Sequence, residues 1–222
     1  MSSLEFGLNL CCNHPSQQVV ALDISSGGLE DLKRAHLSAP PSKGAPSGGA
    51  LLTVVCDVSD PASTEKAAAS ARRWLLGWQP GMSPAKPKAS SNKPSALKAR
   101  SLAAVGSIAG GGSIAGGVDA LVNCAGLIRG GPLVELAPGA LKLIMDVNAL
   151  GPAHATAAFF PLLRTTGPAA MPTVVNVASE VSAAGVSAAF SGPYAMSKWA
   201  LEAYSTALRQ VCCVRWWCVW GC

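Results

Sequence analysis

Residues 18–37 read QVVALDISSGGLEDLKRAHL and join a short apolar run to a helical one. The run at 18–25 is rich in β-branched residues, which favour a strand that ends at Asp23. The stretch at 27–37 has the pattern of a helix. A strand that leads directly into a helix is the basic unit of an α/β fold.

The same alternation repeats along the chain. Strands are predicted at 50–59, 118–126 and 173–179, and helices at 61–78, 138–165 and 193–209. Strands that are apolar throughout and alternate with helices predict a Rossmann-like, doubly wound parallel sheet covered on both faces. Ligands bind beyond the carboxyl ends of such strands. The polar residues at these ends are Asp23, Asp57, Asn123 and Ser179.

The net charge of +5 has a local origin. Residues 80–100 carry five basic residues and no acidic one, so 12 basic residues balance 12 acidic residues in the rest of the chain. A nucleic-acid-binding face is therefore not predicted. This segment continues into the glycine-rich repeat at 106–117. We interpret 80–117 as one low-complexity insertion within a single partial domain that spans 1–222.

The cysteines and histidines indicate neither a disulfide framework nor a metal site. Eight cysteines in 222 residues suit buried, reduced thiols, and neither C-x-x-C nor histidine-ligand spacing is present. No signal peptide and no apolar run of ~18–20 residues is visible. We therefore expect a soluble protein of the cytoplasm or another intracellular compartment, without a membrane span.

The stretch at 193–209, PYAMSKWALEAYSTALR, carries the most specific chemistry. Pro193 suits a first helical position, so Tyr194 and Lys198 stand one helical turn apart on one face. Taken alone, they are equally well explained as ordinary neighbours on a solvated face. A fixed cation beside a phenol favours the phenolate, which would allow Tyr194 to exchange a proton with a substrate oxygen.

Tyr194 and Lys198 form a Y-x-x-x-K motif, and four further motifs precede it. They are VVCDVSD at 54–60, VNCAG at 122–126, MDVNALG at 145–151 and VVNVASE at 174–180. In this order the motifs resemble the short-chain dehydrogenase/reductase family over most of residues 18–210. The resemblance implies an NAD(P)-dependent oxidoreductase that transfers hydride between nicotinamide and an alcohol or carbonyl substrate.

The resemblance also implies roles for individual residues. Tyr194 would be the acid/base, Lys198 would bind the nicotinamide ribose, and Ser179 would hold the substrate oxygen. Asn148 would order a water that relays protons to Lys198. The plainer alternatives are a helix cap for Ser179 and an interhelical hydrogen bond for Asn148.

Cofactor contacts are implied at the strand ends. The positions are Asp23, Asp57, Val58, Asn123, Ala125, Gly126, Tyr194 and Lys198. Cys124 replaces the second asparagine of the family pattern. A carboxylate at Asp23 suits ribose hydroxyls and would repel a 2′-phosphate, which favours NAD over NADP without excluding NADP.

Two parts of the family pattern are not visible. No strand leads into a T-G-x-x-x-G-x-G loop for the pyrophosphate. Its absence would leave the strands at 18–23 and 118–124 without a shared neighbour. After residue 210, VCCVRWWCVWGC stands in place of the substrate-binding part, although 214–220 is β-prone enough to pair as a strand. The predicted sheet thus lacks its first and last family strands.

Two functions stay open from the sequence. The apolar loop at 181–192 permits a small apolar alcohol or ketone as substrate of an oxidoreductase. The alternative is a catalytically inactive or truncated relative that acts as a dimerisation partner. In either case the resemblance implies a homo-oligomer through the helices at 138–165 and 193–210.

Overall fold

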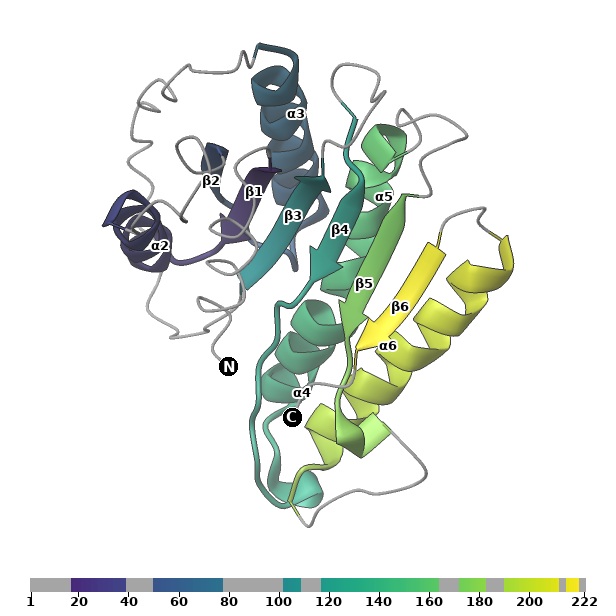
Figure 1. Cartoon of the computed structure of the whole chain (residues 1–222). Helices are drawn as coiled ribbons and strands as arrows, with labels where there is room; N and C mark the ends of the chain where they lie inside the picture. Colours follow the sequence, from purple (N-terminus) through teal and green to yellow (C-terminus); the bar gives the residue numbers. More distant parts are fainter. Residues whose placement is uncertain are drawn as a thin grey trace.

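The computed structural model describes residues 17–38, 50–77, 102–108, 117–163, 172–182, 190–211 and 215–219. Its strands are β1 (Gln17–Asp23), β2 (Ala50–Val55), β3 (Leu102–Ile108), β4 (Ala120–Asn123), β5 (Thr173–Val177) and β6 (Arg215–Val219). Its helices are α2 (Ser26–Ser38), α3 (Pro61–Gly77), η1 (Leu133–Glu135), α4 (Pro138–Met145), η2 (Asp146–Leu150), α5 (Gly151–Leu163), η4 (Glu180–Ser182) and α6 (Gly192–Val211). The predicted α/β alternation is confirmed (Figure 1).

The strands form one six-stranded sheet in the order β2-β1-β3-β4-β5-β6. β1 pairs in parallel with β2, β4 with β5, and β5 with β6. β1 and β4 also run in the same direction, because both are antiparallel to β3. Asp23 and Asn123 therefore end their strands at one edge of the sheet, which we call the carboxyl edge.

β3 is the largest difference from the sequence-based expectation. Its residues belong to the predicted insertion at 80–117, yet they fill the gap between β1 and β4. Asp23 lies opposite Leu102, and Val122 lies opposite Ala104. Two facing strand edges leave backbone N–H and C=O groups to be paired, and an inserted strand satisfies both edges whichever way it runs. The rest of the insertion, at 80–101 and 109–116, lies outside the described residues.

β6 is the edge strand at the end of the sheet opposite β2. The β-prone segment at 214–220 supplies this strand, parallel to β5, with Thr173 opposite Arg215. The pairing that the β-prone sequence at 214–220 allows is thus present, next to β5. The N-terminal segment before residue 17 is outside the described residues.

The helices cover both faces of the sheet. α3 packs along α5, and α4 packs against α6. Figure 1 shows α5 and α6 running behind β4, β5 and β6. Because β-α-β crossovers are right-handed and the chain steps from β1 to β2 in one direction and from β4 to β5 in the other, α2 and α5 lie on opposite faces. The core between strands and helices includes Leu22, Leu121 and Phe159, all fully buried.

No helix within the described ranges is both long and apolar enough to pass through a membrane.

The helical region predicted at 138–165 is not continuous. The π-helix η2 interrupts it between α4 and α5. α5 then begins at Gly151, where a Cβ atom would lie 2.9 Å from Cγ2 of Val58. The nearby His154 Nδ1 lies 3.2 Å from the Val58 carbonyl oxygen. The turn after β2 therefore packs directly on the start of α5, and glycine is needed for that approach.

We predict that Gly151→Ala lowers the free energy of unfolding by about 1–3 kcal/mol, because Val58 must move to admit the methyl group. Chemical denaturation measures the change. Gly139→Ala in α4 is the matched control, since a Cβ there meets nothing within 4 Å. Equal stability of the two variants would contradict the close packing at Gly151.

Candidate active site

The first turns of α6 bring Tyr194 and Lys198 together. The helix begins with Ala195 N donating to Ser191 O at 2.9 Å, and Pro193 sits in its first turn. Nζ of Lys198 lies 5.8 Å from the centroid of the Tyr194 ring. Lys198 is only 4% exposed and donates to Val177 O at 2.7 Å. The cation is thus held beside the phenol and at the end of β5.

Ser179 follows β5 directly and leads into η4. Its carbonyl oxygen accepts from Ser182 N at 2.9 Å and from Ser182 Oγ at 2.6 Å. Trp199 Nε1 donates to Val181 O at 2.8 Å, and this hydrogen bond links the turn to α6. Ser179 itself is buried. The turn that carries Ser179 and the helix that carries Tyr194 are therefore joined by a direct hydrogen bond.

Asn148 is the centre of a third connection. It lies in the π-helix η2 and is completely buried. Its Oδ1 accepts from Leu127 N at 2.7 Å, and its Nδ2 donates to Leu127 O at 2.8 Å and to Ser197 Oγ at 2.9 Å. Both amide hydrogens are used within the protein. The hydrogen bond from Asn148 to Ser197 links η2 to α6, and the role of Asn148 in ordering a water stays a prediction.

Gly126 lies where the loop after β4 meets two other elements. A Cβ atom on Gly126 would lie 3.7 Å from both Asn148 Oδ1 and Lys198 Nζ. The loop after β4, the π-helix and α6 therefore meet at one point of the carboxyl edge. The structure brings Gly126, Asn148, Tyr194 and Lys198 together, and places Ser179 on the neighbouring turn.

Asp23 ends β1 farther along the carboxyl edge. It is 8% exposed, and its Oδ1 accepts from Ser25 N at 2.8 Å. Burial raises the pKa of the Asp23 carboxyl to about 6, against the lowering effect of the Ser25 and Ile24 N–H groups. A buried carboxylate at a strand end is the chemistry that would bind ribose hydroxyls.

The turn after β2 has a mainly local structure. Asp57 Oδ1 accepts from Ser59 N at 2.9 Å and from Ser59 Oγ at 2.6 Å. Asp60 caps the amino end of α3, with Ala62 N donating to Asp60 Oδ1 at 3.0 Å. Val58 is buried against Gly151. The Asp57 carboxylate thus shapes the turn into α3.

The side chain of Asn123 is turned into the protein interior. It donates to Asn176 Oδ1 at 2.8 Å and to Thr156 Oγ1 at 3.3 Å. Asn176 in turn donates to Ser205 Oγ on α6 at 2.8 Å. This network joins β4, β5, α5 and α6 beneath the site. The sequence signal for it is an asparagine within the apolar strand TVVNV, where a buried polar group requires partners.

Cys124 and Ala125 complete the turn after β4. Ala125 is buried, and Cys124 is partly exposed. Within the described ranges, no group of three or more His, Cys, Asp and Glu side chains is arranged to hold a metal ion.

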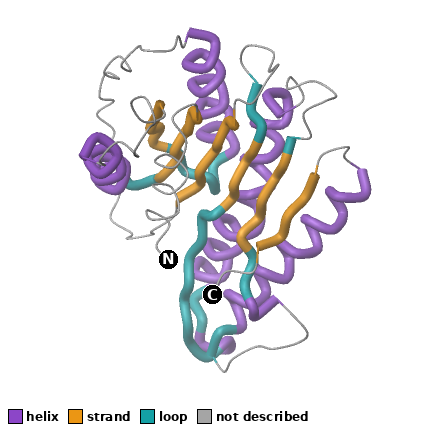
Figure 2. The backbone as a smooth tube through the Cα atoms, viewed as in Figure 1, coloured by secondary structure: helices purple, strands orange, loops and turns teal. Residues whose placement is uncertain are grey.

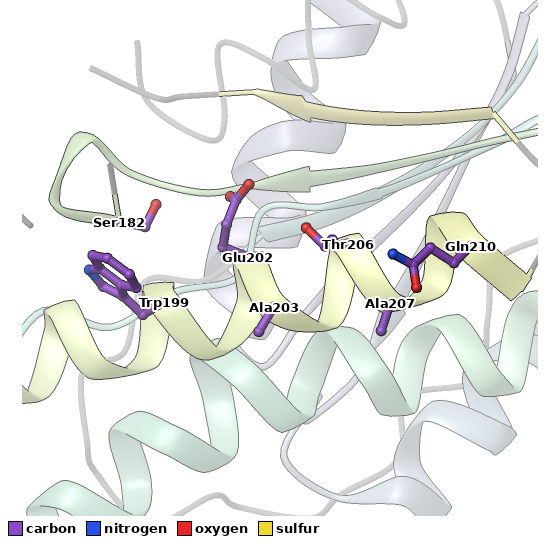
Figure 3. Close-up of a pocket in the computed structure, with 7 residues that line it drawn as sticks. All are labelled: Ser182, Trp199, Glu202, Ala203, Thr206, Ala207 and Gln210. Atoms are coloured by element: carbon purple, nitrogen blue, oxygen red, sulfur yellow. The ribbon is translucent and has the colours of Figure 1, made fainter. Parts of the chain in front are cut away.

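A groove runs along α6 away from the site (Figure 3). Its lining is Ser182, Trp199, Glu202, Ala203, Thr206, Ala207 and Gln210. Figure 3 shows Trp199 beside Ser182 at one end and Gln210 at the other. The groove begins at the turn that follows Ser179 and continues along α6 toward the carboxyl end of the helix.

The described residues fit the two nucleoside parts of a nicotinamide dinucleotide. Asp23 offers a buried acceptor on β1, and Tyr194 and Lys198 offer a phenol and a cation beside Gly126 on the other side. The centre of the edge is different, because the amino end of β3, not a carboxyl end, lies there. A strand, glycine-rich loop and helix in the family order are therefore not found between these two parts in the described ranges.

Comparisons with known proteins agree with this geometry. Residues 103–212 match the short chain dehydrogenase family. Over 92 residues the chain is 40% identical to retinol dehydrogenase 5 of Mus musculus and 38% identical to that of Homo sapiens. This match covers 40% of the chain and 26% of each relative, so it spans about a quarter of their length.

Solved structures share the fold. An alcohol dehydrogenase from the archaeon Thermococcus sibiricus, complexed with 5-hydroxy-NADP, matches with a TM-score of 0.60 and 20% identity, over 90% of this chain and 63% of that one. An NADPH-bound carbonyl reductase from chicken fatty liver matches with a TM-score of 0.58 and 18% identity, over 86% and 58%. The Rossmann-like class predicted from the sequence is thereby confirmed.

Proposed function

The chain belongs to the short-chain dehydrogenase family, and from this premise we propose that it is an oxidoreductase acting on an alcohol or carbonyl substrate with NAD(P). The convergence of Tyr194, Lys198, Asn148 and Gly126 carries the proposal. A bound nicotinamide supplies the chemistry of hydride transfer. The residues of this chain have to hold the substrate oxygen and move its proton.

Tyr194 is the proposed acid/base. Its O–H group gives a proton to a carbonyl oxygen in one direction and takes it from an alcohol in the other. Lys198 is fixed near the ring by burial and by Val177 O, where its charge is proposed to stabilise the negative charge that develops on the reacting oxygen. Ser179 is proposed to donate to the same substrate oxygen from the turn after β5.

Asn148 is proposed to position neighbouring residues through its side-chain hydrogen bonds, and not to bind a water with its side chain. Its amide fixes Leu127, one residue after Gly126, and contacts Ser197, one residue before Lys198. A water that relays protons to Lys198 would then need a hydrogen-bond partner other than the Asn148 amide N–H groups, which are already used. The backbone carbonyls of η2 are the nearest candidates on the same element.

The proposed substrate is a small apolar alcohol or ketone. Two loops near the start of α6 carry exposed apolar side chains, with Ile128 at 73% exposure and Phe190 at 64%. The loops are joined by Gly131 N donating to Phe190 O at 2.9 Å. Phe190 has φ of 67°, a left-handed conformation that is unfavourable for an aromatic residue and is often found at functional sites. Figure 2 shows the long loop after β4 that reaches this region.

Turnover tests the proposal. The full chain is incubated with NAD⁺ or NADP⁺ and a series of short and medium-chain secondary alcohols, and formation of the reduced nicotinamide is followed. We expect NADH to form, with a rate that increases with the apolar area of the alcohol. Failure to reduce either cofactor with any member of the series would contradict the proposed activity.

NAD is the proposed cofactor in preference to NADP, because the buried Asp23 carboxylate would repel a 2′-phosphate. We predict that Asp23→Asn weakens NADH binding about tenfold, since one oxygen acceptor for a ribose hydroxyl is replaced by a donor. Fluorescence titration measures the dissociation constant. Asp31→Asn on the exposed side of α2 is the control and leaves it unchanged.

The same variant changes the pH dependence of stability. Because the pKa of Asp23 is raised in the folded chain from 3.8 to about 6, the folded chain binds a proton that the unfolded chain releases. The wild-type chain therefore loses stability as pH rises between these values. Asp23→Asn is expected to remove this loss and to have the higher melting temperature above pH 6. A lower melting temperature at every pH would contradict it.

We also propose that the outer face of α6 pairs with a second copy of the chain. Met196 and Trp199 are each 47% exposed there, and Ala203, Thr206 and Ala207 continue the exposed face. Size-exclusion chromatography with light scattering decides the state. A dimer that is weakened by Trp199→Glu supports the pairing, and a monomer at all concentrations contradicts it. The same surface would serve the alternative function of an inactive partner subunit.

A further inference from the structure

Ser197 stands between the two catalytic candidates of α6, and its hydroxyl group is completely buried. Its Oγ donates to Tyr194 O at 2.7 Å and accepts from Asn148 Nδ2 at 2.9 Å. The first bond lies within α6. The second crosses to the π-helix η2. One hydroxyl group therefore connects the helix that carries Tyr194 and Lys198 to the element that carries Asn148.

The connection extends to the loop after β4. Asn148 holds both the N–H and the C=O of Leu127, at 2.7 and 2.8 Å. Leu127 follows Gly126, which lies against Lys198 Nζ. The path Tyr194, Ser197, Asn148, Leu127 is thus a continuous series of hydrogen bonds around the point where Gly126 and Lys198 meet.

We propose that Ser197 is a positioning residue for the reaction: it fixes Asn148, and through Asn148 the Gly126–Leu127 loop, relative to Tyr194 and Lys198. The catalytic meaning of this inference rests on the proposed function. Its structural part, the dependence of the Leu127 contact on Ser197, does not.

The chemistry of the hydroxyl group explains why serine is required. Ser197 gives its one hydrogen to Tyr194 O and keeps its lone pairs for the Asn148 amide. Alanine would leave an N–H of Asn148 without a partner in a site that has no exposure to water. Threonine keeps the hydroxyl group and can bond the preceding turn in the same way.

Ser205 on the same helix provides a matched control. Its Oγ donates to Leu201 O at 2.7 Å and accepts from Asn176 Nδ2 at 2.8 Å. It is buried like Ser197 and makes the same two kinds of hydrogen bond, but to a different asparagine. Loss of either hydroxyl group removes comparable interactions, and only the loss at Ser197 affects Asn148.

Hydrogen exchange at the Leu127 amide tests the inference in Ser197→Ala, Ser197→Thr and Ser205→Ala. We expect exchange at Leu127 to become about tenfold faster in Ser197→Ala, and to stay at the wild-type rate in Ser197→Thr and Ser205→Ala. If Ser197→Ala does not fold, Ser197→Cys keeps a side chain of the same connectivity but is a weaker donor and acceptor, and it decides by the same readout. Equal exchange in the two alanine variants overturns the inference.

Kinetics provide the second readout. With the alcohol that the wild-type chain oxidises fastest, Ser197→Ala is expected to lower kcat about tenfold with little change in KM for NAD⁺, and Ser197→Thr restores kcat. A parallel loss in Ser205→Ala would show a general structural effect and overturn the positioning role. A wild-type chain without NADH binding would refute the proposed function alone, because the exchange result needs no cofactor.

Discussion

Tyr194→Phe is expected to abolish turnover while NADH binding stays close to that of the wild-type chain. Phenylalanine keeps the ring beside Lys198 but lacks the O–H group that exchanges a proton with the substrate oxygen. General acid–base catalysis contributes about 10²–10⁴-fold to the rate, so kcat should fall by that range. Steady-state kinetics with the best alcohol measure the loss, and fluorescence titration with NADH shows that the site is intact.

The second tyrosine of the chain makes this test specific. Tyr204 lies on the same helix, ten residues after Tyr194, and Tyr204→Phe is expected to keep wild-type kcat. If Tyr194→Phe retained more than about a tenth of wild-type kcat, proton transfer by this phenol would be refuted.

The substitution Lys198→Met is expected to cause the second large loss of activity. Methionine has a similar length and is apolar, so it suits a position that is 4% exposed. The substitution removes the cation beside Tyr194 and the donor to Val177 O. We expect kcat to fall by about 10²-fold or more, and NADH affinity to fall as well, because the same side chain is proposed to bind the ribose.

Lys142→Met controls for the loss of a positive charge. Lys142 is exposed and pairs with Asp146 at 2.6 Å on the surface of the helical region. An exposed pair of this kind contributes little to stability. Wild-type kinetics in Lys142→Met and strong loss in Lys198→Met are expected, and equal effects of the two variants would contradict a local role of Lys198.

Much of the fold follows from local sequence patterns. Strands and helices such as β1, α2 and α3 begin and end close to their predicted bounds, because apolar runs and the cap at Asp60 act over a few residues. The pairing of Tyr194 with Lys198 is also local, since it requires only one helical turn. The carboxyl ends of the parallel strands could also be assigned to one edge of the sheet, because parallel strands run in the same direction.

The place of β3 in the sheet could not be predicted from such local patterns. Its seven residues, LAAVGSI, overlap the glycine-rich repeat and give no clear signal of a central strand. Their place depends on the open edges of β1 and β4, which are remote in sequence. Pairing of this kind is decided by unsatisfied backbone groups of the assembled sheet and not by the segment itself.

The hydrogen bonds of the site could be predicted only in part. The motif at 145–151 indicates Asn148 as a site residue. Its bonds to Leu127 and Ser197, however, depend on the π-helix and on the packing of α6. Ser197 has no role in the sequence-based prediction, although a buried serine on a helix requires hydrogen-bond partners. Asn176 and Ser205 follow the same rule. Buried polar residues next to a motif are the signal that would have identified them.

Equilibrium titration of the full chain with NADH, followed by energy transfer from its tryptophans to the nicotinamide, tests the central claim most directly. The six tryptophans of the sequence include Trp199, next to Lys198 on α6. The account predicts saturable binding that NAD⁺ displaces and that Lys198→Met weakens. Unchanged fluorescence at millimolar NADH would contradict the proposed oxidoreductase and would favour the role of a non-catalytic partner subunit.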